Sequence, residues 1–272
     1  SWEAGLDMRM FQGRIGLDFT YYKTETTNQI MNIPVSASTG YINKLINAGK
    51  MSSHGVEIML NGTPIRMQDW QWDLTLNWGM STSRCEELHP DIKRFELGGT
   101  SIGTVVVREG EKFGDIIGKA YKRNEAGEVL VDDRGLPLYE SDRIVGNMMP
   151  DWTGSIQSTL RWKDLSFSML IDVKQGGDVI SMTDAIACAS GNSTRTLAYR
   201  DGGMVVRGVN VNTGIANAKE ISAQDFYEEV GGAGGVTEEF LYDGSYVKMR
   251  EMSLGWNIPK RWLLKTPLQS IK

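Results

Sequence analysis

Long apolar runs are absent from this sequence of 272 residues. A helix that crosses a bilayer needs about 20 consecutive, mostly apolar residues, and no stretch of the sequence approaches that length. Membrane-spanning helices are therefore excluded. Membrane-spanning strands are not excluded, because a strand that alternates apolar and polar residues has a low average hydropathy.

Cysteine, histidine and clustered basic residues are also scarce. Cys85 and Cys188 are too few for a disulfide framework. His54 and His89 lie in predicted loops with no Cys or carboxylate at metal-ligand spacing, which is typical of surface residues. With a net charge of −5 and no Lys/Arg stripe, the chain is not expected to bind nucleic acid.

Sequence motifs for catalysis or ligand binding are weak. GGAGGV at residues 231–236 lacks the Lys-Ser/Thr of a phosphate loop and predicts a flexible loop. Three acidic pairs lack EF-hand spacing, which favours solvated charge over calcium ligands; they are Asp132-Asp133, Glu228-Glu229 and Glu238-Glu239. No Ser/His/Asp set converges. We therefore expect no catalytic residues, metal, cofactor or enzymatic activity, and assign no substrate-binding residue.

A regular alternation of apolar and polar residues is present instead. In WQWDLTLNWGM, residues 70–80, three tryptophans, two leucines and a methionine alternate with polar or small residues. Side chains along a strand point to opposite faces with a period of two, so the pattern indicates a strand between two different environments. A single strand of this kind fits a soluble sheet half-buried on a core. The alternative is a transmembrane barrel strand between lipid and an aqueous lumen, which one strand cannot distinguish from the first interpretation.

The connections between alternating segments indicate the architecture. Further alternation occurs at residues 4–10, 14–21, 56–60, 152–162, 165–173 and 251–258. Short connections at Gln12-Gly13, residues 66–69 and Lys163-Asp164 alternate with long segments at residues 23–54, 81–151 and 175–245. Outer-membrane barrels alternate short turns and long loops in this way, whereas soluble domains seldom use structureless loops of this length. We expect an all-β fold, an antiparallel meander forming part of a large transmembrane β-barrel, with the short turns at one end and the long loops at the other.

Two tryptophans give a length for the apolar face. Trp152 and Trp162 lie on one face of a predicted strand. At about 3.3 Å per residue and a tilt of about 40°, they are roughly 25 Å apart along the membrane normal, which matches the apolar band between two aromatic girdles. We expect Leu76 and Phe167 to face lipid near the midplane. The polar face is expected to line the lumen through Arg9, Asp18, Asp73, Asn77, Gln157, Arg161, Asp172, Glu251 and Asn257.

The long segments have compositions of their own. NEAGEVLVDDRGLPLY, residues 124–139, predicts a small hairpin with Asp133-Arg134-Gly135 as its turn. The stretches SGNSTRTLAYRDGGMVV and EEVGGAGGVTEEF are Gly-rich and polar, and they predict surface excursions.

Several short motifs run through nearly the whole chain. They are NAG at residues 47–49, GVE at 55–57, NMMPDWTGS at 147–155, RDGG at 200–203 and YDGSYVKMREMSLGWNIPKRWL at 242–263. Together, and in this order, they resemble the later barrel of SusC/RagA-type TonB-dependent transporters. Both ends of the sequence also look like sheet structure. The resemblance implies that residues 1–272 are a partial barrel domain, whose plug, TonB box and final strands lie outside this sequence.

The resemblance also implies a function and partners. Members of this family form plugged barrels of about 22 strands and import glycans or peptides across the outer membrane of Gram-negative, Bacteroidetes-type bacteria. A SusD-like surface lipoprotein closes the external mouth, and the TonB complex acts through the N-terminal plug. The expected partners are therefore that lipoprotein, the TonB complex, an oligosaccharide or peptide substrate, and membrane lipid.

Two other interpretations are open on the sequence. One is a soluble all-β glycan-binding or adhesin module whose long loops make the contacts. Such a module would need no detergent, whereas a lipid-facing aromatic belt would aggregate in plain buffer. The other is a secreted β-rich enzyme, which the lack of a catalytic set disfavours.

Overall fold

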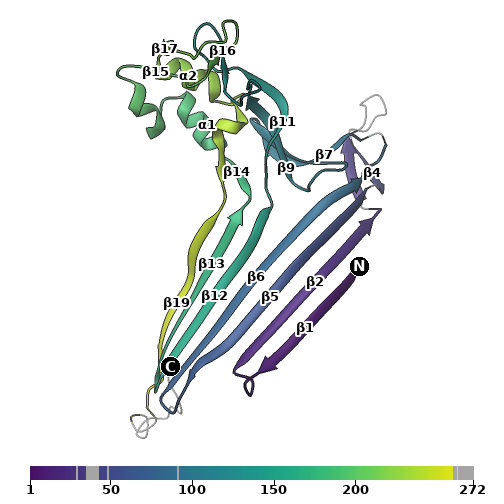
Figure 1. Cartoon of the computed structure of the whole chain (residues 1–272), viewed down its shortest axis with the longest axis vertical. Helices are drawn as coiled ribbons and strands as arrows, with labels where there is room; N and C mark the ends of the chain where they lie inside the picture. The colour runs from purple at the N-terminus through teal and green to yellow at the C-terminus, as the bar shows by residue number, and fades with distance from the viewer. Residues whose placement is uncertain (29, 35–42, 48, 91, 260–261, 263–272) are drawn as a thin grey trace.

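One antiparallel sheet of seven strands forms most of the computed structural model, which describes residues 1–28, 30–34, 43–47, 49–90, 92–259 and 262. Its strands adjoin in chain order, as the alternation of short and long connections predicted (Figure 1). They are β1 (Trp2–Met10), β2 (Ile15–Thr27), β5 (Lys50–Arg66), β6 (Trp70–Glu87), β12 (Pro150–Trp162), β13 (Leu165–Gly176) and β19 (Tyr246–Trp256). Within the described residues β1 and β19 are edge strands, so the sheet is not closed into a barrel.

The register of the sheet gathers the apolar residues on one face. Each strand contributes one member to a continuous cross-strand row, which runs Met8, Leu17, Leu60, Leu76, Ile156, Ile171 and Met249. Side chains on this face are exposed or half-buried, and on the edge strand β19 Leu254 and Val247 have 78% and 74% of their surface accessible. Leu76 and Phe167 both lie on this face, as expected, but the expected depth of Phe167 is wrong: it lies opposite Leu160, close to Trp162 and away from the midplane. An exposed apolar face of this extent suits contact with lipid.

Aromatic residues lie toward both ends of the apolar face. At the end with the short turns, the rings of Trp70 and Trp162 stack with centroids 5.6 Å apart. Toward the other end, Trp2 and Tyr21 have ring centroids 5.2 Å apart. Amphipathic rings at both borders of an apolar band are the arrangement seen in transmembrane barrels.

The strands are longer than the alternation indicated. β2, β5 and β6 continue past the apolar band as a polar ladder, in which Thr24 pairs with Ser53 and Ser53 with Ser83. The two serine hydroxyl oxygens are 2.7 Å apart. The prediction that His54 lies in a loop is therefore wrong: it is an exposed residue of β5. The long excursions shrink to residues 28–49, 88–149 and 177–245.

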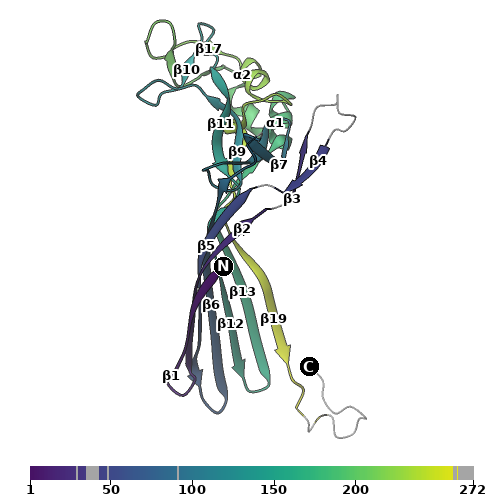
Figure 2. The ribbon, with the colours of Figure 1, turned by 90° about the vertical axis from the view of Figure 1, so that its right-hand side faces the viewer.

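The short connections all meet at one end of the sheet, opposite the excursions (Figures 1 and 2). The Lys163 N–H donates to the carbonyl of Asp69 over 2.9 Å, and the Asn257 N–H donates to the carbonyl of Asp164 over 2.8 Å. Lys163 adopts φ 51°, the left-handed conformation that a two-residue hairpin turn requires. The predicted topology of the turns is confirmed.

The excursions form a second layer of structure at the other end. A hairpin of β3 (Ile30–Pro34) and β4 (Asn43–Asn47) rises between β2 and β5. The excursion between β6 and β12 contains β7 (Arg94–Thr100), β8 (Gly103–Arg108), β9 (Asp115–Tyr121), β10 (Leu130–Val131) and β11 (Tyr139–Asn147). The excursion between β13 and β19 contains β14 (Asp178–Ile180), α1 (Met182–Ala189), η2 (Thr194–Tyr199), β15 (Met204–Val205), β16 (Val209–Asn210), β17 (Glu220–Ile221), α2 (Ala223–Val230), η3 (Thr237–Phe240) and β18 (Leu241–Asp243).

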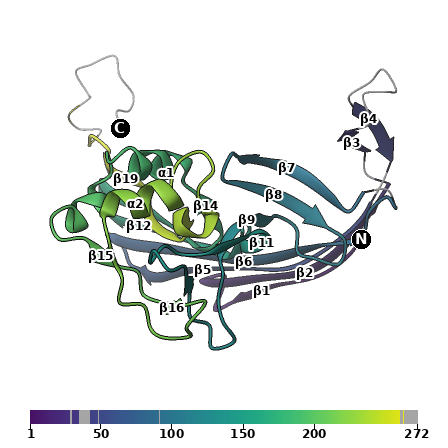
Figure 3. The same ribbon diagram turned by 90° about the horizontal axis from the view of Figure 1, so that it is seen from above.

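These last two excursions, residues 88–149 and 177–245, pack together into one unit that we term the cap. Its core contains Ile102 and Leu136 from the first excursion with Val230, Val236 and Phe240 from the second. β10 pairs in parallel with β16 across the two excursions, and α1 and α2 lie beyond the ends of β13 and β19, on that side of the cap (Figures 1 and 3). The prediction that EEVGGAGGVTEEF is a surface excursion is wrong, because Val230, Val236 and Phe240 are fully buried.

The predicted hairpin at residues 124–139 is confirmed. Leu130 and Leu138 are paired through the backbone, and the Gly135 N–H donates to the carbonyl of Asp132 over 3.0 Å to close the turn. Gly135 has φ 88°, a conformation that glycine adopts without steric cost. Among the helices of the described residues, none is long and apolar enough to cross a membrane.

Candidate functional site

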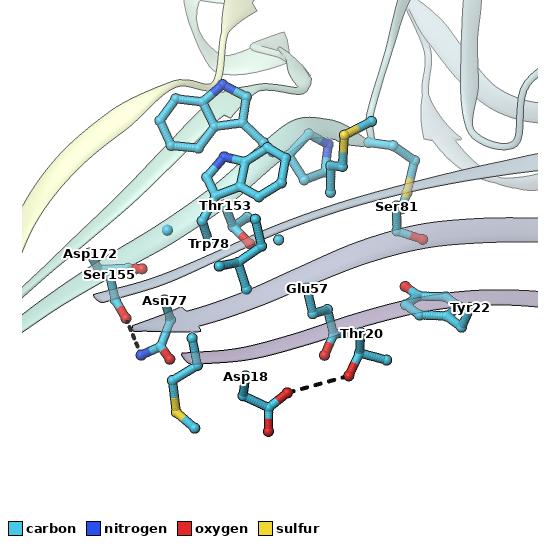
Figure 4. Close-up of a pocket in the computed structure, with 18 residues that line it drawn as sticks. Asp18, Thr20, Tyr22, Glu57, Asn77, Trp78, Ser81, Thr153, Ser155 and Asp172 are labelled. Carbon is cyan, nitrogen blue, oxygen red and sulfur yellow. Dashed lines mark hydrogen bonds between the residues drawn. The ribbon is translucent and has the colours of Figure 1, made fainter. Parts of the chain in front are cut away.

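The polar face of the sheet carries the candidate site. A cross-strand row next to the apolar one runs Asp7, Asp18, Met59, Asn77, Ser155, Asp172 and Lys248. Asn77 donates to the hydroxyl oxygen of Ser155 over 3.1 Å, which links β6 to β12 (Figure 4). Because a strand reverses its side chains at every residue, this row faces away from the apolar row beside it.

A hollow of about 640 Å³ opens at the cap end of the sheet. Its polar lining comes from five of the sheet strands and consists of Asp18, Thr20, Tyr22, Glu57, Asn77, Ser81, Thr153, Ser155 and Asp172 (Figure 4). Met149 and Pro150 border it where the cap continues into β12. An apolar part of the lining consists of Ile58, Met59, Trp78, Met80 and Trp152. Hydroxyl, amide and carboxylate groups among apolar side chains suit a solute that carries hydroxyls or amides, since a few placed polar groups orient a ligand.

Charge in the hollow is unevenly compensated. The carboxylate of Asp172 accepts from the Arg250 guanidinium over 2.7 and 2.9 Å and from the Tyr246 hydroxyl over 3.0 Å. Asp18 accepts a long contact of 3.5 Å from the Thr20 hydroxyl. Within the part of the chain that the structure describes, no cation lies within ion-pair distance of Asp18 or Glu57. These two carboxylates are therefore available to donors of a solute or of another part of the protein.

Arg250 occupies a bulge that the sequence pattern did not reveal. The β13–β19 register shifts between Leu170–Glu251 and Ile171–Met249, so Arg250 is the extra residue of β19. The shift keeps Val247 and Met249 on the same face as Met252 and Leu254. The alternation therefore changes phase at Arg250, which explains why the sequence indicated a strand that begins only at residue 251.

Of the nine residues expected to line the lumen, eight share the polar face of the sheet; they are Arg9, Asp18, Asp73, Asn77, Gln157, Arg161, Asp172 and Glu251. Asn257 follows the end of β19 and lies outside the sheet. Asp73 pairs with Arg161 over 2.9 Å, nearer the turn end. The expectation did not include Glu57, whose place in the alternation GVEIMLN was nevertheless visible.

A second cluster of polar side chains, separate from the hollow, lies in the cap around the guanidinium of Arg195. It donates to Asp184 over 2.8 Å and to the Tyr242 hydroxyl over 3.0 Å, and it also contacts Glu239. Burial alone would raise the pKa of the Asp184 carboxyl, but hydrogen bonds from Tyr242, Arg195 and Ser193 together outweigh burial and lower it. This network joins α1, η2, η3 and β18, so its role is to hold the cap together.

The remaining candidate ligands are engaged in structural contacts. Asp132 accepts from the Arg134 side chain over 2.8 Å, and Glu238 accepts from Arg123 over 3.1 Å. In the described residues, no group of three or more His, Cys, Asp or Glu side chains could hold a metal ion. Asp132 thus closes a turn of the cap, and Glu238 joins η3 to the end of β9.

Comparison with known sequences identifies relatives over nearly the whole chain. A family model described as "TonB dependent receptor-like, beta-barrel" matches residues 1–266. TonB-dependent receptor P3 of Formosa agariphila is 25% identical over 296 residues, an alignment that covers 99% of this chain and 28% of that protein. TonB-dependent receptor SusC of Bacteroides thetaiotaomicron is 34% identical over 79 residues, covering 28% of this chain and 8% of that protein.

Solved structures share the fold. The structure of the RagAB peptide transporter superposes with a TM-score of 0.68 at 15% identity, covering 98% of this chain and 30% of that one. The RagAB peptide importer in the "open-open" state gives a TM-score of 0.65 at 16% identity, with 98% and 29% covered. The chain thus spans less than a third of the length of these proteins.

Proposed function

Because the chain belongs to the TonB-dependent receptor β-barrel family, we propose that it forms part of the wall of an outer-membrane importer of the SusC/RagA kind. In this proposal residues 1–272 are a partial barrel domain, and the plug and the remaining strands belong to other parts of the protein. The importer takes up glycans or peptides with energy from the TonB complex.

The observation that carries the proposal is the difference between the two faces of the sheet. The row through Leu76 is apolar on all seven strands, while the adjacent row through Asn77 carries polar or charged residues on six of the seven. A soluble glycan-binding module would cover the apolar face with a second layer, and in the described residues the cap lies at the end of the sheet instead (Figure 2). Lipid on one face and a water-filled lumen on the other account for both rows.

The hollow at Asn77 is our candidate for a substrate contact. Sugar hydroxyls and peptide amides both donate and accept hydrogen bonds, as the lining groups do. Uptake of fluorescently labelled oligosaccharides and peptides by cells that produce the full-length protein would identify the class. We expect Asn77→Leu to lower uptake several-fold. Gln157→Leu is the matched control, because it lies on the same face but outside the lining of the hollow.

Two results would contradict this assignment. Equal uptake by Asn77→Leu and wild type would remove the hollow from the substrate path. An equal loss in Asn77→Leu and Gln157→Leu, at equal amounts of protein in the outer membrane, would indicate that general damage to the polar face causes the loss.

We further propose that the cap is the docking surface for a SusD-like lipoprotein that covers the mouth. The cap is a packed unit on a rigid sheet, and loops held in this way commonly carry binding residues. η2 and β15 expose Leu197, Tyr199 and Val205, of which Leu197 is 57% accessible. Exposed apolar and tyrosine side chains are the usual centres of protein interfaces.

Co-purification of the full-length protein with its lipoprotein tests the docking surface. Replacing residues 177–245 with a short turn should abolish the complex, and Leu197→Glu should weaken it at least tenfold. Ile215→Glu adds the same charge at a position of the cap that is 68% exposed, outside the η2–β15 segment, and should leave binding unchanged. If the partner is retained without residues 177–245 and only leakage through the pore rises, the cap is a shield.

A further inference from the structure

A groove of about 510 Å³ crosses the apolar face near the short-turn end of the sheet. Its floor is the cross-strand row of Ile15, Gly62 and Leu74. Gly62 has no side chain, so a furrow opens between Ile15 and Leu74. Leu60 and Leu76, from the next row on the same apolar face, form one wall of the groove. The apolar face is therefore indented at Gly62, between two bulky side chains.

The mouth of the groove carries a cation. The backbone of β5 bulges between Gly62 and Ile65. Two hydrogen bonds fix Arg14 to this bulge. The Thr63 N–H donates to the Arg14 carbonyl over 2.8 Å, and the Arg14 guanidinium donates to the Pro64 carbonyl over 3.2 Å. Among the described residues, no carboxylate lies within ion-pair distance of Arg14. A positioned guanidinium without an acidic partner is a ready donor for an anion.

The position of Arg14 along the strand matches the border of the apolar band. Arg14 belongs to the β1–β2 turn, and its partners Thr63 and Pro64 immediately precede the end of β5 at Arg66. The next strand begins with Trp70, one of the stacked tryptophans at this end. In a barrel with short periplasmic turns, Arg14 is thus level with the headgroups of the inner leaflet, which is built of phospholipid.

We propose that this groove binds one acyl chain of a phospholipid and that Arg14 contacts the lipid phosphate. The inference rests on the proposed function, because it requires the apolar face to lie in a membrane. Lipid tails are as apolar as leucine, so hydrophobic transfer supplies no selectivity here. Selectivity comes from the shape of the furrow at Gly62 and from the planar donors of Arg14, which match a phosphate in geometry and charge.

The exposed ring of Phe11 also lines the groove. Phe11 lies in the β1–β2 turn with φ 54° and has 70% of its surface accessible. An exposed aromatic residue in a strained turn is costly in water, where apolar surface is unfavourable. Beside a lipid chain the same ring gains van der Waals contact.

Photo-crosslinking in vesicles tests the proposal. The full-length protein is reconstituted into phosphatidylcholine vesicles with a small fraction of phosphatidylglycerol that carries a diazirine on its acyl chain, and the labelled peptides are mapped by mass spectrometry. We expect labelling to concentrate at residues 60–64 and 74–76. Gly62→Leu fills the furrow and should lower that labelling at least tenfold. The backbone tolerates a side chain there, since a Cβ at Gly62 would meet nothing closer than the Arg14 carbonyl oxygen at 3.6 Å.

Two further variants separate the parts of the inference. Arg14→Gln removes the cation and should lower labelling by the anionic probe several-fold. Ala4→Leu adds similar bulk to the same face near the other end of the sheet and should change nothing. If Gly62→Leu abolishes labelling while Arg14→Gln has no effect, the groove holds a chain without recognising phosphate and the proposed contact is wrong.

The outcome also distinguishes failure of this inference from failure of the proposed function. Even labelling over the whole apolar face, including Leu6 and Phe19, would support a lipid-facing barrel and overturn the groove. If no residue of the apolar face is labelled although the protein is in the vesicle, then the membrane assignment itself fails.

Discussion

Arginine at Leu76 should destabilise the barrel because it places a charge in the centre of the hydrocarbon. Leu76 pairs with Ile156, which lies between Trp152 and Trp162 on β12. At about 2.5 Å of depth per residue, Ile156 is roughly 10 Å from one girdle and 15 Å from the other. Arginine near the midplane costs about 2–4 kcal/mol. The folding equilibrium should therefore fall roughly 30-fold to 700-fold, since each 1.4 kcal/mol is tenfold.

The urea dependence of tryptophan fluorescence for the full-length protein folded in lipid vesicles measures this change. Thr75→Arg is the matched control: Thr75 pairs with Asn61 and Gln157 on the polar face, so the cost should stay within about 0.5 kcal/mol. Phe167→Arg should cost nearer 1 kcal/mol, because Phe167 lies opposite Leu160, close to Trp162. Equal destabilisation at Leu76 and Thr75 would refute the assignment of the two faces.

Two further perturbations test the lipid face and the cap. On the lipid face, the Trp72 indole N–H donates to the Ser158 hydroxyl over 2.9 Å; Ser158→Ala leaves that N–H without a partner in hydrocarbon and should cost about 1–2 kcal/mol in the same urea assay. Ser155→Ala, which removes a bond on the polar face, should cost less than half as much, and equal costs would contradict the assignment. In the cap, the pKa of Asp184 is lowered in the folded state, so its ionised form stabilises the cap above the unfolded pKa of about 3.9, and this stability is lost as the pH falls through the lower folded pKa. The protection of α1 amides from hydrogen exchange, taken relative to the intrinsic exchange rate at each pH, should therefore fall on acidification below about pH 4 in the wild type and depend less on pH in Asp184→Asn; identical protection profiles would refute the role of the Arg195 network.

The sequence by itself determined the sheet and its two faces. A strand has a side-chain period of two, and short turns make neighbouring strands antiparallel, so polar residues such as Asp18, Asn77 and Asp172 had to share one face of the sheet. The alternation of short and long connections likewise placed all the excursions at one end. These features depend on residues close together in the chain, which is why a local pattern predicts them.

The tertiary structure alone decided the cap. EEVGGAGGVTEEF has too few apolar residues to predict burial, yet Thr237 within it is fully buried. Its hydroxyl oxygen accepts from the Lys119 N–H over 2.8 Å, and a Cβ at Gly118 would come within 1.9 Å of it. The glycine and the threonine are more than a hundred positions apart. No period or propensity connects them, since burial here results from two excursions that meet only in the folded chain.

The bulge and the groove have the same physical origin. Arg250 leaves the regular ladder because the β13–β19 register shifts there, and Gly62 becomes a furrow because Ile15 and Leu74 come to lie on either side of it. A sequence pattern gives the face on which each residue lies. The register of the folded sheet sets the neighbours on the adjacent strands. These neighbours decide whether a glycine leaves a furrow and whether an arginine pairs with Asp172.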